Sequence, residues 1–140
     1  MSQPLNTRIV LASRPVGRVK PDNFRIEETP IPQPADGEIL LKILFLSLDP
    51  YMRGRMDDAK SYAAPVAING VMEGGTVAEV VESRHADYAA GDIVLSHSGW
   101  QSHALSDGNG LRKLDPKAGP LSTALGVLGM PGFTAYTGLL

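Results

Sequence analysis

Short β-prone runs separated by clusters of glycine and proline are the feature that most constrains this chain. Its 140 residues include 15 glycines and 11 prolines, well above the ordinary share of about 12% for the two residue types together. These turn formers lie between apolar runs along the whole chain. The pattern therefore favours many short strands joined by turns over a helical bundle.

Several apolar segments are typical of strands. They cover residues 8–12, 24–29, 38–48, 76–82, 93–95, 100–105 and 111–114. The nearly continuous apolar run over 38–48 predicts a strand covered on both faces. Residues 76–82 alternate in polarity, which predicts a strand with its valines on one face. Asp107 to Gly110 form a hairpin-type sequence that predicts a return into the segment 111–114.

Three segments favour helical turns. Asp49 can cap a turn that has Pro50 in its first position, residues 121–128 are rich in Ala and Leu, and residues 134–140 begin a helical pattern with Thr134 as N-cap. No C-cap signal follows Thr134 before the sequence ends. This pattern predicts that the sequence is a piece of a longer protein.

Composition argues against several classes of function. Lys and Arg number 13 against 15 Asp and Glu, so the formal net charge of −2 leaves no basic footprint for nucleic acid or an anionic membrane. No apolar run approaches the roughly 20 residues that span a bilayer, and residues 1–8 lack the apolar core of a signal peptide. The absence of cysteine excludes disulfides and thiolate zinc sites. We therefore expect a cytoplasmic protein with no membrane or nucleic-acid partner.

Familiar chemical motifs are missing. Gly108 and Gly110 begin like a dinucleotide-binding turn, but Lys113 stands where the third glycine should be. The three histidines at 85, 97 and 103 are not spaced as metal ligands, which predicts no metal site. No Gly-x-Ser-x-Gly sequence occurs, which argues against a hydrolase nucleophile.

Four segments, in this order, resemble one known family. They are residues 46–55 (LSLDPYMRGR), 74–83 (GGTVAEVVES), 88–94 (YAAGDIV) and 128–140 (LGMPGFTAYTGLL). They are similar to the zinc-independent branch of the medium-chain dehydrogenases/reductases, with its prostaglandin reductases, plant alkenal double-bond reductases and bacterial curcumin reductases. The resemblance implies a mainly β fold with a few helices, the GroES-like partly open β-barrel, over residues 1–125. Residues 126–140 would begin the connection to a Rossmann domain that binds NADPH.

The implied reaction is NADPH-dependent reduction of the C=C bond of an α,β-unsaturated aldehyde or ketone. A hydride goes to the β-carbon and a proton to the α-carbon. Met72 stands where zinc-containing alcohol dehydrogenases carry a histidine, so hydrogen-bond donors must stabilise the developing enolate. The expected partners are a small-molecule enal or enone and, as an open alternative, a second copy of the chain in a homodimer.

The resemblance also assigns the site residues. Tyr51 is the expected catalytic donor, whose hydroxyl can bind the substrate carbonyl while its ring stacks on a flat substrate. His97, Ser98 and Trp100 are expected to line the substrate pocket with Tyr51. Met130 and Thr134 are expected to contact the nicotinamide.

Four other residues have expected roles near this site or in the structure around it. Gly75 stands where plant relatives have a second tyrosine, which predicts a roomier pocket. Asp49 is expected to cap a helix, Arg53 to form a salt bridge, and Glu73 to be an exposed acid at a strand edge.

The sequence is also compatible with other functions. The enzyme could instead reduce quinones, or the chain could be a stand-alone barrel that binds a hydrophobic ligand or peptide on a face with Tyr51 and Trp100. Tyr51 and Trp100 could also be ordinary packing residues, and Thr134 only a helix cap.

Overall fold

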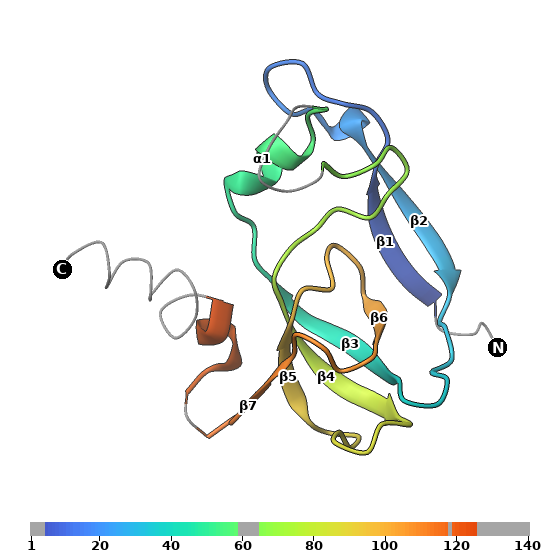
Figure 1. Ribbon diagram of the computed structural model, residues 1–140. Coiled ribbons are helices and arrows are strands. Elements are labelled where there is room, and N and C mark those ends of the chain that lie inside the picture. The colour runs from blue at the N-terminus through green and yellow to red at the C-terminus, as the bar shows by residue number, and fades with distance from the viewer. Residues whose placement is uncertain (1–4, 59–64, 118, 126–140) are drawn as a thin grey trace.

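The computed structural model describes residues 5–58, 65–117 and 119–125 (Figure 1). These residues form two antiparallel sheets and a few short helical segments. In chain order the elements are β1 (Leu5–Leu11), η1 (Pro21–Asn23), β2 (Phe24–Pro30), β3 (Ile39–Leu46), α1 (Tyr51–Arg55), β4 (Thr76–Ser83), β5 (Ile93–Ser96), β6 (His103–Ser106), β7 (Arg112–Leu114) and η2 (Leu121–Leu125), where η denotes a 3-10 helix. The expected preponderance of short strands is confirmed.

The strands pair both with their neighbours in the chain and with strands further along it. β1 and β2 form a two-stranded sheet, and the other strands form a five-stranded sheet in the order β6-β3-β4-β5-β7. Bridges from Arg8 to Gln101 and from Val10 to Val71 connect β1 to the segments beside the larger sheet. Because β6 and β7 lie at opposite edges, the larger sheet does not close on itself within the described residues.

Two clusters of buried side chains form the core. One is formed by side chains of β3, β4 and β5 in the five-stranded sheet and consists of Ile39, Leu41, Ala78, Val80 and Val94. The other joins α1 to β1 and consists of Leu11, Met52, Met56, Val66 and Met72. The second cluster matters for function, because it anchors the helix that carries Tyr51.

Three details of the sequence-based expectation are wrong. β3 is buried only in its first half, since Leu44 and Phe45 near its end are exposed. β4 buries the consecutive residues 76–78 on both faces, because it lies in the middle of the sheet between β3 and β5. The turn at 107–110 is not a hairpin, because β7 pairs with β5, and three strands lie between β7 and β6.

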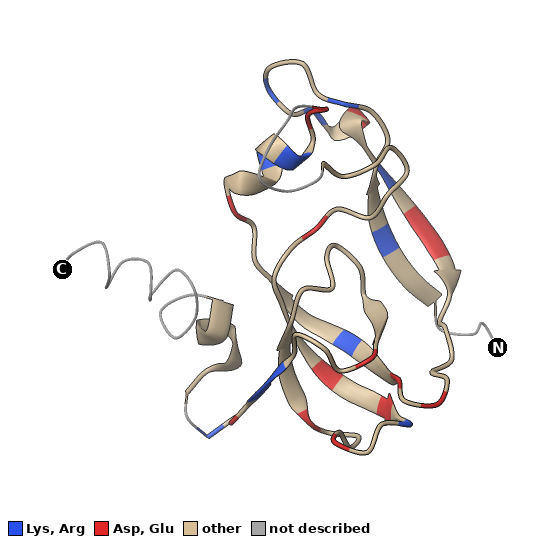
Figure 2. Cartoon of the chain, in the orientation of Figure 1, with Lys and Arg blue, Asp and Glu red and all other residues tan. Residues whose placement is uncertain are grey.

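Charges of both signs are spread over the described surface. Figure 2 shows basic and acidic residues interspersed along the strands, with two arginines on α1. Within the described ranges, no helix combines the length and the apolar character needed to cross a membrane.

Candidate functional site

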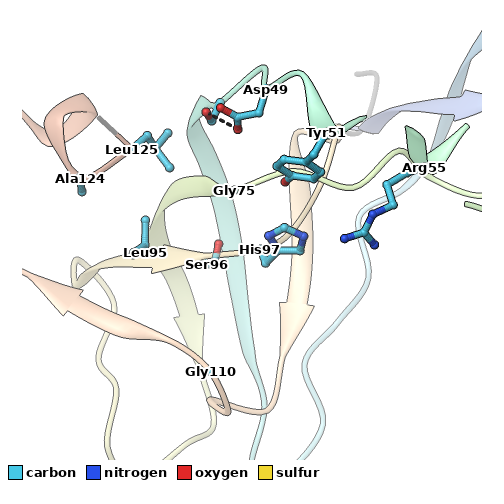
Figure 3. A pocket seen from close by; sticks show the side chains of 11 residues that line it. Asp49, Tyr51, Arg55, Gly75, Leu95, Ser96, His97, Gly110, Ala124 and Leu125 are labelled. Carbon is cyan, nitrogen blue, oxygen red and sulfur yellow. Dashed lines mark hydrogen bonds between the residues drawn. The ribbon is translucent and has the colours of Figure 1, made fainter. Parts of the chain in front are cut away.

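A cavity of about 430 Å³ lies where the end of β3, the start of β4 and the end of β5 meet α1 and η2. Its two sides differ in chemistry (Figure 3). Tyr51, Arg55 and His97 line one side, and Leu95, Ala124 and Leu125 line the other. The cavity can therefore receive a ligand that has an apolar body and a polar end.

Helix α1 places Tyr51 and Arg55 at the cavity by simple helical geometry. The two residues are four positions apart, so they share one face of the helix. Met52 and Met56, one position further along, are both buried in the core cluster of α1 and β1. The methionines thus fix the rotation of the helix that presents Tyr51 to the cavity.

Asp49 is not the side-chain cap of α1 that its position suggested. The N-cap is Pro50, and no side chain accepts a capping hydrogen bond there. The Asp49 carboxylate instead accepts a bond from the Ser47 hydroxyl at 2.7 Å, which holds it at the cavity wall. The structural role expected for Arg53 is confirmed, since its guanidinium pairs with Asp57 at 2.8 Å.

Arg55 is a cavity residue that the sequence reasoning missed. Its guanidinium carbon lies 5.6 Å from the centre of the Tyr51 ring, and Nη1 lies 3.3 Å from an oxygen of Glu73. The Arg55 side chain is 14% exposed and that of Glu73 is 40% exposed. The i, i+4 spacing from Tyr51 was the signal in the sequence that could have identified Arg55.

The last residue of β5 contributes a buried hydroxyl to the cavity wall. Buried Ser96 lines the cavity, and its Oγ lies 2.5 Å from Thr76 Oγ1 and 2.9 Å from Ser98 Oγ. His97 also lines the cavity. Ser98 lies behind Ser96 and borders a neighbouring cavity rather than this one.

Trp100 is not at this cavity. Its ring packs against the core cluster of α1 and β1, with the Phe24 ring 5.5 Å away between centroids. Its indole N–H is buried without a hydrogen-bond partner among the described residues. The structure therefore brings Tyr51 and His97 together at the cavity, whereas Trp100 does not line it.

Gly75 leaves space in the cavity wall. A Cβ placed there would lie 3.5 Å from Leu125 Cδ2, an ordinary contact, so a larger side chain would extend into the cavity. This geometry agrees with the expectation of a roomier pocket. Met130 and Thr134, the expected nicotinamide contacts, lie outside the described residues.

The position of Met72 bears on metal binding. Met72 is fully buried in the core cluster of α1 and β1, so its side chain is part of the packing. In the part of the chain that the structure describes, no group of three or more His, Cys, Asp or Glu side chains is placed to hold a metal ion. The lack of a metal site remains a prediction.

Comparison with known proteins gives a consistent result. Residues 7–114 match a family described as the N-terminal domain of oxidoreductase. The chain is 58% identical over 135 residues to the NADPH-dependent curcumin reductase of Escherichia coli (strain K12), covering 96% of this chain and 39% of that protein. It is 49% identical over 121 residues to prostaglandin reductase 1 of Rattus norvegicus, covering 84% and 35%.

A solved structure supports the same relationship. The crystal structure of CurA in complex with NADPH from Vibrio vulnificus superposes with a TM-score of 0.90 at 56% identity, covering 96% of this chain and 40% of that one. The chain thus spans about two fifths of the length of these relatives. The expected fold class, a mainly β GroES-like domain, is confirmed. The chain belongs to the family of oxidoreductase N-terminal domains, in the zinc-independent branch of the medium-chain dehydrogenases/reductases.

Proposed function

We propose that this chain is the substrate-side domain of an NADPH-dependent reductase that reduces the C=C bond of α,β-unsaturated aldehydes and ketones. The observation that carries the proposal is the two-sided cavity, in which Tyr51 and Arg55 face Leu95 and Leu125. An enone has a matching shape, with a polar carbonyl at one end and an apolar body. The names of the relatives, an NADPH-dependent curcumin reductase and a prostaglandin reductase, support the coarser part of the proposal, that the enzyme is a reductase.

The described residues are better suited to bind the substrate than to bind the phosphates of the cofactor. They contain no glycine-rich turn that joins a strand to a helix, the usual cradle for dinucleotide phosphates. We therefore propose that residues 1–125 form the substrate-side domain, and that residues 126–140 begin the connection to a cofactor-binding domain. When bound, NADPH supplies the hydride.

Tyr51 has the central role in this mechanism. As the β-carbon is reduced, the C=C electron pair moves toward the carbonyl, and negative charge develops on the substrate oxygen. A hydrogen bond from the Tyr51 hydroxyl to that oxygen stabilises the charge more in the transition state than in the substrate. The Tyr51 ring stacks on the conjugated substrate, and Leu95 and Leu125 exclude water from its apolar end.

Substitution of Tyr51 in the full-length enzyme tests this function. Tyr51→Phe keeps the stacking ring and removes one donor, a loss that typically costs about 10²–10³ in kcat. We expect a smaller fall, on the order of tenfold in kcat, because a donor from the cofactor-binding domain shares the charge. Tyr51→Ala should also raise KM, because the stacking surface is lost.

Steady-state NADPH oxidation with a series of enones provides the measurement. Residues 1–140 alone should not turn over, because hydride transfer requires the cofactor-binding domain. A full-length enzyme that reduces no enone would refute the proposed function. Unchanged kcat and KM in both Tyr51 variants would instead remove Tyr51 from the site.

A further inference from the structure

The wall of the cavity contains a permanent positive charge beside Tyr51. Arg55 lines the cavity, and its guanidinium lies against the Tyr51 ring, 5.6 Å from the ring centre. Arginine stays protonated at any physiological pH. In the view of Figure 3 the Tyr51 ring is drawn between Arg55 and the carboxylate of Asp49, the acidic residue among those that line the cavity. The polar end of the cavity is therefore positive on the Arg55 side.

Glu73 is an acidic neighbour of Arg55 and offsets part of its charge. Nη1 of Arg55 lies 3.3 Å from Oε2 of Glu73, and the Glu73 side chain is 40% exposed while that of Arg55 is 14% exposed. Water screens the carboxylate more than the guanidinium, so a positive field remains on the cavity side. Glu73 thus sets how strong this field is.

Arg53 on the same helix shows what a purely structural arginine does here. Its guanidinium pairs with Asp57 at 2.8 Å and donates to the backbone carbonyls of Pro15 and Gly17. These contacts hold the loop after β1 against α1. Arg53 does not line the cavity, which makes it a charge-matched control for Arg55.

We propose that Arg55 stabilises the negative charge that develops on the substrate oxygen beside Tyr51, and that Glu73 limits this effect. The inference rests on the proposed function. In that reaction NADPH gives a hydride to the β-carbon and becomes NADP⁺, the C=C electron pair forms the enolate, and a proton then adds at the α-carbon. Arg55 exchanges no proton in this sequence. It lowers the energy of the enolate through its charge.

Equilibrium binding of two probes tests this role in the full-length enzyme. 4-Nitrophenolate carries its negative charge on an oxygen of a flat conjugated ring, as an enolate does, and 4-nitroanisole is a neutral analogue of similar shape. Arg55→Met should weaken 4-nitrophenolate binding by about tenfold and change 4-nitroanisole binding less than twofold. Arg55→Lys should retain most of the preference for the anion, and kcat for enone reduction should fall in Arg55→Met.

Glu73→Gln makes the test sharper, because its expected effect on 4-nitrophenolate affinity is opposite to that of Arg55→Met. Removal of the counter-charge should strengthen 4-nitrophenolate binding severalfold, whereas a purely structural salt bridge predicts loss in both variants. Arg53→Met removes the same charge from the same helix and should leave the ratio of the two affinities unchanged. Where circular dichroism shows that Arg55→Met is unfolded, Arg55→Lys and Glu73→Gln decide the question.

Three results would overturn the inference. They are a wild-type enzyme without preference for the anion, equal losses of both probes in Arg55→Met, and weaker anion binding in Glu73→Gln. Each can occur in an enzyme that still reduces enones, so these results differ from failure of the proposed function, in which the wild-type enzyme reduces none.

Discussion

Gly99 holds the segment after β5 in place, and its replacement by alanine should destabilise the protein strongly. Its φ of +77° lies in the left-handed region, where a residue with a Cβ costs about 1–2 kcal/mol. A Cβ at this position would also lie at only 2.4 Å from the carbonyl oxygen of Met72. That oxygen accepts the Trp100 N–H at 2.9 Å, so it cannot move away without weakening a hydrogen bond that contributes about 1 kcal/mol. We expect Gly99→Ala to lower the free energy of unfolding by about 3 kcal/mol.

Gly37→Ala separates the cost of the left-handed backbone from the cost of the close contact with Met72. Gly37 has a φ of +83°, but no atom lies within 4 Å of its added Cβ, so only the backbone cost of about 1 kcal/mol applies. Urea denaturation followed by circular dichroism measures both variants. The difference of about 2 kcal/mol corresponds to about 1 M in the midpoint, for an m value near 2 kcal/mol per M. Equal midpoints for the two variants would refute the argument that close packing against Met72 requires glycine.

Other substitutions and conditions test the remaining features. Met72 is fully buried, so Met72→Ala should lower the free energy of unfolding by about 2–5 kcal/mol, measured by thermal or urea unfolding. The Ile26 side chain is 69% exposed, so Ile26→Ala should change the free energy of unfolding by no more than about 0.5 kcal/mol. Similar losses of stability in the two variants would contradict the core assignment. Burial, helped by the nearby charge of Lys42, holds the pKa of His103 below 6.5. The folded state therefore binds this proton less readily than the unfolded state, so the contribution of His103 to stability is complete above about pH 6.5 and decreases as the pH falls toward the lower folded pKa. His103→Gln should flatten that decrease. A pKa of His103 at or above 6.5 in an NMR titration would contradict this explanation. Elemental analysis of the dialysed protein should find no stoichiometric zinc, and one zinc per chain would overturn the expectation of a metal-free site.

Part of the site could be predicted from local sequence. The LDPYMR segment places Tyr51 at the start of a helical turn, because Pro50 fits the beginning of a helix and Met52 and Met56 repeat at helical spacing. The same spacing relates Tyr51 to Arg55, so the cavity face of α1 is present in the sequence. The strands from β1 to β7 were likewise located by short apolar runs between turn formers.

Partners across the fold could not be predicted in this way. The turn sequence at 107–110 is typical of a hairpin, yet β6 pairs with β3 and β7 pairs with β5. Trp100 follows the cavity residue His97 by three positions, but the left-handed turn at Gly99 directs its ring into the core beside Phe24. The contact of Arg55 with Glu73 joins residues 18 positions apart.

The sequence by itself therefore determined where most strands and turns form and which helical face carries Tyr51. Tertiary structure alone decided which strands are neighbours, whether an aromatic residue lines the cavity or the core, and which acid meets Arg55. The physical reason is the range of the interactions. Turn conformation and amphipathic periodicity depend on residues a few positions apart, whereas strand pairing and burial depend on contacts between distant segments, whose selection requires the whole chain to pack at once.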